Sequence, residues 1–191
     1  MQKTEARKIA KKQILRLDAC EKEWASGAIS DYISGVDEFN RAHNVFVFLG
    51  TLDEPDTTEI IGLALMLERT VSVPRIEKDG MHAIVISPYT NFVSNKLGIL
   101  EPVSGHDAID FDVAVVPVVA FDGVNRVGHG AGCYDKFLSS HDCFKIGIAF
   151  DCQEVKGLEF EDFDVPLDMI ITEKRVIFKD KQIPNPFGEE L

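Results

Sequence analysis

The sequence is short of the residues that mark disulfide-bonded and zinc-binding proteins. It contains four cysteines in 191 residues, and no two of them have the C-x-x-C spacing. The five histidines are scattered as well, and none stands at a metal-binding spacing from a cysteine. We therefore expect reduced thiols in a cytoplasmic protein, with neither a disulfide framework nor a zinc site.

Positive charge and long apolar segments are also scarce. Lys and Arg number 20 against 32 Asp and Glu, which gives a formal net charge of −12. Nucleic acids and anionic membranes favour basic surfaces, so neither is expected as the main partner. No uncharged apolar run approaches the roughly 20 residues of a membrane-spanning helix. The charged segment 1–12 is not followed by an apolar stretch, so we expect no signal peptide.

What the chain does contain is the composition of an ordinary globular protein, with 45% apolar residues. Apolar residues at helical spacing predict helices over residues 3–25, 30–39 and 60–69. Gly27 is expected to end the first helix, and Ser30 to cap the second. Short apolar runs predict strands over residues 44–49, 71–74, 81–87, 113–120, 145–150, 169–172 and 175–178. We expect segment 91–102 to be irregular.

This alternation predicts an α/β fold. We expect a Rossmann-like three-layer sandwich, with a largely parallel central sheet and helices on both faces. One domain is expected over residues 1–191, with a loosely held tail over about 179–191. Ligands of such sheets bind at the carboxyl ends of strands. Three loops lie at such ends, after Leu49, after Ala120 and after Phe150.

The second of these regions carries a glycine loop. The apolar run 113–120 is followed by a turn signal at Asp122-Gly123, and then by Gly128, Gly130 and Gly132 before an expected helix. Alternating glycines let backbone N–H groups converge on one point, and a helix start adds further unpaired N–H groups. This pattern is typical of a phosphate site, although glycines alone also fit a plain tight turn.

Charged residues near this loop point to the same chemistry. Arg126, two residues before the first glycine, can add a positive charge. Asp135 can be a metal ligand or simply a favourable residue in the first turn of a helix. Lys3, Arg7 and Lys11 follow each other at four-residue spacing, which opposes the helix slightly. They form either a solvated basic stripe or a phosphate clamp.

The chain also matches a series of blocks in a fixed order. Pro117 with Phe121-Asp122 fits Pro-Gly-x-x-Phe-Asp, and residues 126–135 fit Arg-x-Gly-x-Gly-x-Gly-Tyr-Tyr-Asp. Further matches are Lys3, Arg7, Glu54, Thr57, Pro74-Arg75, Met81, Gly98-Ile99, Glu101-Pro102, Asp164 and Asp168. With these blocks spread over about residues 3–173, the chain resembles the 5-formyltetrahydrofolate cyclo-ligase family, also called methenyltetrahydrofolate synthetase.

The resemblance implies conversion of 5-formyltetrahydrofolate to 5,10-methenyltetrahydrofolate with ATP and Mg²⁺, releasing ADP and phosphate. It implies that ATP is bound by Lys3, Arg7, Arg126, Gly128, His129, Gly130, Ala131, Gly132, Cys133 and Tyr134, with Arg126 as the catalytic residue. The implied folate-binding residues are Leu49, Glu54, Gly128, His129, Gly130, Ala131 and Gly132. The implied Mg²⁺ ligands are Asp135 and Asp164. We expect the enzyme to act as a monomer.

Some positions depart from the family pattern. Val118 replaces the glycine after the proline, and Cys133 replaces the first tyrosine of the Tyr-Tyr pair. Ala131 stands where many members carry Lys or Gly, and it cannot supply a charge to a phosphate. These changes leave open a folate-binding paralogue without turnover. A second alternative is another phosphate-handling α/β enzyme, such as a sugar-phosphate isomerase or coenzyme A transferase, with Glu101 as its carboxylate.

Overall fold

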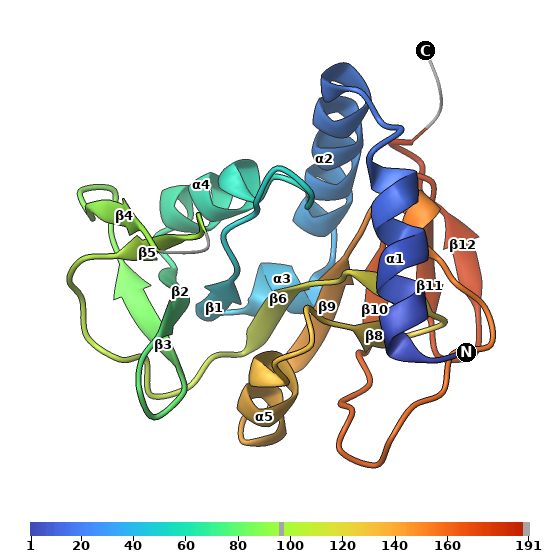
Figure 1. Cartoon of the computed structure of the whole chain (residues 1–191). Helices are drawn as coiled ribbons and strands as arrows, with labels where there is room; N and C mark the ends of the chain where they lie inside the picture. The colour runs from blue at the N-terminus through green and yellow to red at the C-terminus, as the bar shows by residue number, and fades with distance from the viewer. Residues whose placement is uncertain (96–97, 189–191) are drawn as a thin grey trace.

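The computed structural model describes residues 1–95 and 98–188, which fold around one large sheet (Figure 1). Its strand order is β12 (Gln182–Pro184), β11 (Arg175–Phe178), β10 (Met169–Ile171), β9 (Phe144–Ile148), β6 (Val113–Pro117), β1 (Asn44–Val47), β2 (Thr70–Ile76) and β3 (Met81–Ile86). The strands from β10 to β2 run parallel, whereas β3, β11 and β12 are antiparallel to their neighbours. The expected largely parallel sheet is confirmed.

Helices cover both faces of this sheet. Side chains alternate along the strands, so that Val45 and Val47 of β1 enter one apolar cluster and Phe46 enters another. The first cluster is completed by α2 (Ala19–Ser34), α3 (Asp37–Arg41) and α4 (Thr58–Met66). The second is covered by α5 (Cys133–Ser139), through Phe137 and Leu138. The three-layer arrangement is therefore confirmed.

The segment after β6 differs from the expected single strand. The run 113–120 divides at Pro117, because a proline has no N–H group with which to continue the strand ladder. Residue 120 instead opens a small hairpin of β7 (Ala120–Asp122) and β8 (Asn125–Val127), whose turn holds Gly123 at φ 61°. The glycine loop follows β8 rather than the central strand. The hairpin packs against α1 (Lys3–Ile14).

The predicted helix over residues 3–25 is in fact two helices. The chain leaves α1 after Ile14 and starts α2 at Ala19, with Asp18 as the N-cap. Asp18 accepts a hydrogen bond from the Glu21 backbone, and the Glu21 side chain accepts one from the Asp18 backbone. Gly27 and Ser30, expected to end one helix and cap the next, both lie inside α2. The capping box therefore starts a new helix at residue 19, although the helical spacing of apolar residues continues without a break through this point.

Two other segments are more ordered than expected. Within segment 91–102, β4 (Phe92–Ser94) pairs with β5 (Leu100–Pro102). The expected loose tail contains β12, and Asn185 is buried with its side chain bonded to Ala28 and Thr172. The part of the tail beyond residue 188 lies outside the described residues. A short 3-10 turn, η1 (Asp151–Gln153), completes the elements.

None of the helices in the described ranges is both long and apolar enough to span a bilayer.

Candidate active site

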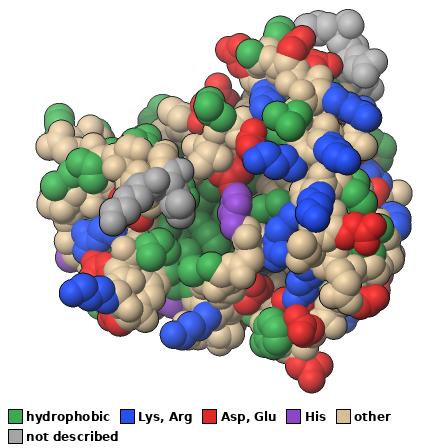
Figure 2. Space-filling model, viewed as in Figure 1, with side chains coloured by type: hydrophobic (Ala, Val, Ile, Leu, Met, Phe, Trp, Pro, Cys, Tyr) green, Lys and Arg blue, Asp and Glu red, His purple; other side chains and the backbone are tan. Residues whose placement is uncertain are grey.

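A deep cleft opens at the carboxyl ends of β1 and β6. The strand order changes direction between these two strands, because β2 follows β1 on one side while β9 follows β6 on the other. Such a switch point is where open α/β sheets bind ligands. The cleft has a volume of about 1390 Å³, above the roughly 300–1,000 Å³ of a site for one small ligand. Figure 2 shows a hollow with an apolar floor and Lys and Arg side chains gathered over α1.

The cleft brings together nearly all of the residues that the sequence predicted. Its lining includes Lys3, Arg7, Glu54, Arg126, Gly128, His129, Gly130, Ala131, Gly132, Cys133, Tyr134, Asp135 and Asp164. Leu49 is the exception. It is not among the lining residues and packs instead against the main apolar cluster.

Glycine is needed at different positions of the loop for different structural reasons. Gly130 and Gly132 have φ values of 113° and 66°, a backbone region that other L-residues rarely adopt. Gly128 makes room for Arg126, since a Cβ at residue 128 would lie 2.9 Å from the Arg126 Nη1 atom. Helix α5 has only seven residues. An anion at this site would therefore depend more on the loop and its basic neighbours than on the start of the helix.

Arg126 is a buried cation whose donors are largely unused. It lies in β8, is 3% exposed, and its guanidinium stands 5.4 Å from the ring centre of Tyr134. Its Nη2 atom lies 3.1 Å from Asp135 Oδ1, yet none of its three nitrogens has a well-aligned hydrogen-bond partner among the described residues. Burial lowers the pKa of Arg126, and the charge of Asp135 opposes this. Such a group on a cleft wall is suited to an anion.

The N-terminal helix contributes two further cations. Arg7 donates from Nε to the carbonyl oxygen of Gly128 over 2.7 Å, which ties α1 to the glycine loop. Lys3 donates to Asp164 over 2.7 Å and to Glu161 over 2.9 Å. Burial lowers the pKa of Lys3, but the hydrogen bonds to these carboxylates outweigh it, so the pKa lies above its ordinary value. Lys3 and Arg7 therefore face the cleft as charged groups.

Two carboxylates lie close to the same cations. The side chains of Asp135 and Asp164 are 18% and 12% exposed, and both raise the pKa of Arg126 by their charge. Carboxylate oxygens reached from a wet cleft are the donors that Mg²⁺ prefers, usually one or two per ion with water and phosphate completing the shell. The chemistry of these two side chains is therefore compatible with a magnesium ion.

Glu54 also lines the cleft and contacts the glycine loop through His129. It is 8% exposed, and its Oε2 atom accepts hydrogen bonds from the backbone and hydroxyl of Thr51. Its Oε1 atom lies 2.9 Å from Nε2 of His129, a contact between residues 75 positions apart. The neighbouring Tyr134 has its pKa raised by burial and then by the charge of Glu54. A buried acceptor of this kind suits a ligand that presents N–H donors.

The chain is similar to known proteins along most of its length. The model of the 5-formyltetrahydrofolate cyclo-ligase family matches residues 2–173. The chain belongs to this family. The 5-formyltetrahydrofolate cyclo-ligase of Escherichia coli K12 is 33% identical over 146 residues, covering 71% of this chain and 80% of the relative. The family members are ligases, and this chain is therefore an enzyme of that class.

Other relatives extend the match along the chain. The cyclo-ligase of Haemophilus influenzae is 28% identical over 176 residues, covering 86% of this chain and 92% of the relative. The NMR structure of Aquifex aeolicus 5,10-methenyltetrahydrofolate synthetase aligns with a TM-score of 0.82 at 27% identity. That alignment covers 99% of this chain and 95% of the other.

An apolar wall of the cyclo-ligase cleft was missed at the sequence level. It consists of Pro74, Ile76, Met81, Ile99 and Leu100, from β2, β3 and the β4–β5 hairpin. The signal was present, because most of these residues lie in blocks that match the family and had no assigned role. Glu101 also lines the cleft, but its carboxylate is engaged by Asn95 and by the backbone of Ile76.

The third candidate loop, after Phe150, does not serve the main cleft. Asp151 accepts hydrogen bonds from Arg175 over 2.7 Å and from the Thr172 hydroxyl over 3.1 Å. Gln153 is fully buried and donates to the carbonyl oxygens of Val118 and Val119. This loop therefore secures the end of β6 and the C-terminal hairpin rather than a ligand.

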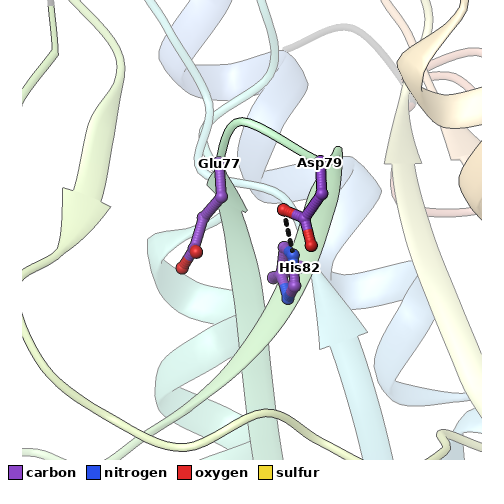
Figure 3. Close-up of side chains that lie close together, drawn as sticks. All are labelled: Glu77, Asp79 and His82. Atoms are coloured by element: carbon purple, nitrogen blue, oxygen red, sulfur yellow. Dashed lines mark hydrogen bonds and ion pairs between the residues drawn. The ribbon is translucent and has the colours of Figure 1, made fainter.

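Glu77, Asp79 and His82 gather at the β2–β3 turn, close enough together to suggest a metal site (Figure 3). Each is already engaged, however. Glu77 accepts hydrogen bonds from Arg75, and His82 stands between Asp79 at 3.0 Å and Asp107 at 2.9 Å. Hydrogen bonds to Asp79 and then Asp107 raise the pKa of His82, which favours an imidazolium over a metal ligand. The group is best explained as an ion network that holds the turn.

Proposed function

We propose that this enzyme converts 5-formyltetrahydrofolate to 5,10-methenyltetrahydrofolate, with ATP hydrolysed to ADP and phosphate. The observation that carries the proposal is the buried Arg126, a cation without an aligned hydrogen-bond partner among the described residues, on the lining of a cleft shared by the glycine loop and Glu54. A basic phosphate-binding half and an acceptor for a heterocycle lie in one space. The family match from residue 2 to 173 supports the same reaction.

The chemistry explains why ATP is required. A formamide carbonyl is a poor electrophile, and its oxygen is a poor leaving group. Transfer of the terminal phosphoryl group of ATP to the formyl oxygen forms an O–P bond and breaks the bond to ADP. The neighbouring folate amine then attacks the formyl carbon, loses its proton, and forms the new C–N bond as phosphate leaves. Both steps depend on positioning and charge neutralisation.

The basic half of the cleft has the groups for phosphoryl transfer. Arg126 would stabilise the negative charge on the transferred group, at a fixed position that needs little rearrangement. Lys3 and Arg7 would hold the remaining phosphates from α1, and the N–H groups of residues 128–134 would line the phosphate path. Ala131 supplies no charge, so more of the binding falls to these side chains.

Asp135 and Asp164 are the proposed ligands of Mg²⁺. The bound ion would neutralise phosphate charge in the transition state. Lys3 pairs with Asp164 and Arg126 lies beside Asp135, so these carboxylates would exchange cationic partners when the ion arrives. The pairing compensates their charges when no ion is bound.

The folate would occupy the other half of the cleft. Glu54 can accept hydrogen bonds from adjacent N–H groups of the pterin, and the apolar wall from β2 to β5 suits its flat rings. Leu49 would support this site indirectly, since it lies between β1 and the Glu54 loop and packs against the main apolar cluster. We further propose that the enzyme acts as a cytoplasmic monomer, which light scattering on the purified protein would check for oligomeric state.

A near-ultraviolet absorbance assay tests the function. The protein is mixed with 5-formyltetrahydrofolate, ATP and Mg²⁺, and formation of methenyltetrahydrofolate is followed. We expect product only when all three are present, and one ADP released per product. Folate binding without product would contradict the proposal, and would make Ala131 and Cys133 the first positions to revert to family residues.

A further inference from the structure

One contact joins the two halves of the cleft. His129 belongs to the glycine loop, whereas Glu54 belongs to the loop after β1, and their side chains meet at 2.9 Å. The Glu54 side chain is only 6% exposed, while that of His129 is 64% exposed. The imidazole therefore stands on the solvent side of the pair, between the carboxylate and the open cleft.

The contact matters for ligand binding because Glu54 can accept only a limited number of hydrogen bonds. A carboxylate oxygen accepts about two hydrogen bonds. Oε2 already receives both donors of Thr51, so Oε1 is the oxygen with capacity left for a ligand. His129 occupies that oxygen in the structure. Because Thr51 fills Oε2, a ligand with two adjacent N–H donors needs both acceptor positions of Oε1, and it must compete with the imidazole for one of them.

Other charged groups around His129 do not replace this partner. Arg7 is engaged by the carbonyl oxygen of Gly128, and Asp53 and Lys11 share a smaller cavity of about 220 Å³ with His129 and Glu54. Among the described residues, His129 has one carboxylate in direct contact, that of Glu54.

We propose that His129 is a latch on Glu54. In the empty enzyme its imidazole holds the carboxylate and restrains the glycine loop, and folate binding must displace it. The proposal rests on the assignment of Glu54 to the pterin. It makes His129 a residue that acts on folate through Glu54, in addition to any contact with phosphate.

Removal of the latch should tighten folate binding. We expect His129→Ala to lower the Kd for 5-formyltetrahydrofolate, measured without ATP, by about two- to five-fold, the range of a partly exposed contact between two polar side chains. His129→Gln keeps an N–H donor and should stay near wild type. His43→Ala is the matched control, since His43 is exposed at the opposite, amino end of β1. The KM for ATP should change less than the KM for folate.

A double-mutant cycle isolates the pair. In a Glu54→Gln background, His129→Ala should no longer improve folate binding. Weaker or unchanged folate binding in the His129→Ala single variant would overturn the latch, as would a gain that persists without the Glu54 carboxylate.

Hydrogen–deuterium exchange on the empty protein separates the latch from the proposed function. His129→Ala and Glu54→Gln should each speed amide exchange over residues 128–132, and His43→Ala should not. If wild type bound no folate, the proposed function would fail, and the exchange result alone would decide the latch. Unchanged exchange in both variants would refute it.

Discussion

The two walls of the cleft hold their ligands by different means. The wall formed by α1, β8 and the glycine loop presents Lys3, Arg7 and Arg126, each next to a carboxylate or carbonyl oxygen. The wall formed by β2, β3 and the β4–β5 hairpin is mainly apolar, and Glu54 lies between the two. Ion pairs can exchange partners when a charged ligand arrives, whereas a sheet-bound apolar surface is fixed in advance. The first wall is therefore suited to a charged ligand such as the proposed ATP, and the second to a ligand whose shape matches a fixed apolar surface.

The largest effect is expected when the buried charge of the first wall is removed. Arg126→Met keeps much of the side-chain volume but removes the guanidinium. We expect kcat to fall by about 100- to 1,000-fold, as when a preorganised transition-state donor is lost. Folate binding without ATP should change far less.

Arg41→Met provides the control, because Arg41 is exposed on α3 and pairs with Asp37 at the surface. Thermal melting of both variants checks that the fold survives. Near-normal kcat in a folded Arg126→Met protein would mean that the loop N–H groups and Mg²⁺ suffice for phosphoryl transfer.

The proposed folate side of the cleft is tested through Glu54. Glu54→Gln replaces a charged acceptor by an amide, and a hydrogen bond to a charged group contributes about 1.5–3 kcal/mol. We expect the KM for folate to rise by about 10- to 100-fold, with the KM for ATP changing less. Glu38→Gln, at an exposed position on α3, should leave both constants unchanged. Equal losses for the two substrates would indicate that Glu54 holds the loop rather than the pterin.

Two glycine substitutions separate loop geometry from general stability. Gly130→Ala puts a side chain at φ 113°, and such backbone strain costs about 1–3 kcal/mol. We expect the loop to shift and the KM for ATP to rise at least about five-fold. Gly62→Ala, in the open interior of α4, should instead raise stability by about 0.5–1 kcal/mol without affecting ATP. Kinetics and thermal unfolding of both variants give the comparison, and a normal KM in Gly130→Ala would show that the positive φ is not required.

Sequence patterns predicted the sheet well because buried parallel strands need apolar runs. The errors fell where a local signal competed with the pattern. The Asp18–Glu21 capping box broke a helix whose apolar period continued through it, and Pro117 ended a strand whose apolar character did not change. Strand β12 was missed because it is short, exposed and ends at Pro184, so little in its composition marks a strand.

The candidate site likewise has a part that could be predicted from the sequence and a part that could not. The glycine loop, Arg126 and the N-terminal cations could be predicted because a motif with a chemical purpose carries them. The contact of His129 with Glu54 could not, because it depends on how two loops 75 positions apart approach each other. The apolar wall was also missed, because the family blocks that contain Met81 gave it no role, and Ile76 in a cleft looks the same in sequence as a core residue.

The smallest predicted effect concerns the support of the apolar wall. Ile76 and Met81 line the cleft from the β2–β3 hairpin, whose turn carries the His82 network of Figure 3. Hydrogen bonds to Asp79 and then Asp107 raise the pKa of His82. A raised pKa contributes stability below the unfolded value of about 6.5, and this stability is lost as pH rises through the folded value.

Asp79 determines the pH below which the network stops contributing to stability. Its pKa is lowered, first by the hydrogen bond to His82, so its share is present above about pH 4 and lost as pH falls further. Wild type should therefore melt above His82→Gln at about pH 5, and the gap should close towards about pH 9. His106→Gln, at an exposed position in the loop before β6, is the matched control. A gap that stays constant across this range would mean that His82 acts by packing alone, and the turn would then support the apolar wall without an ionic contribution.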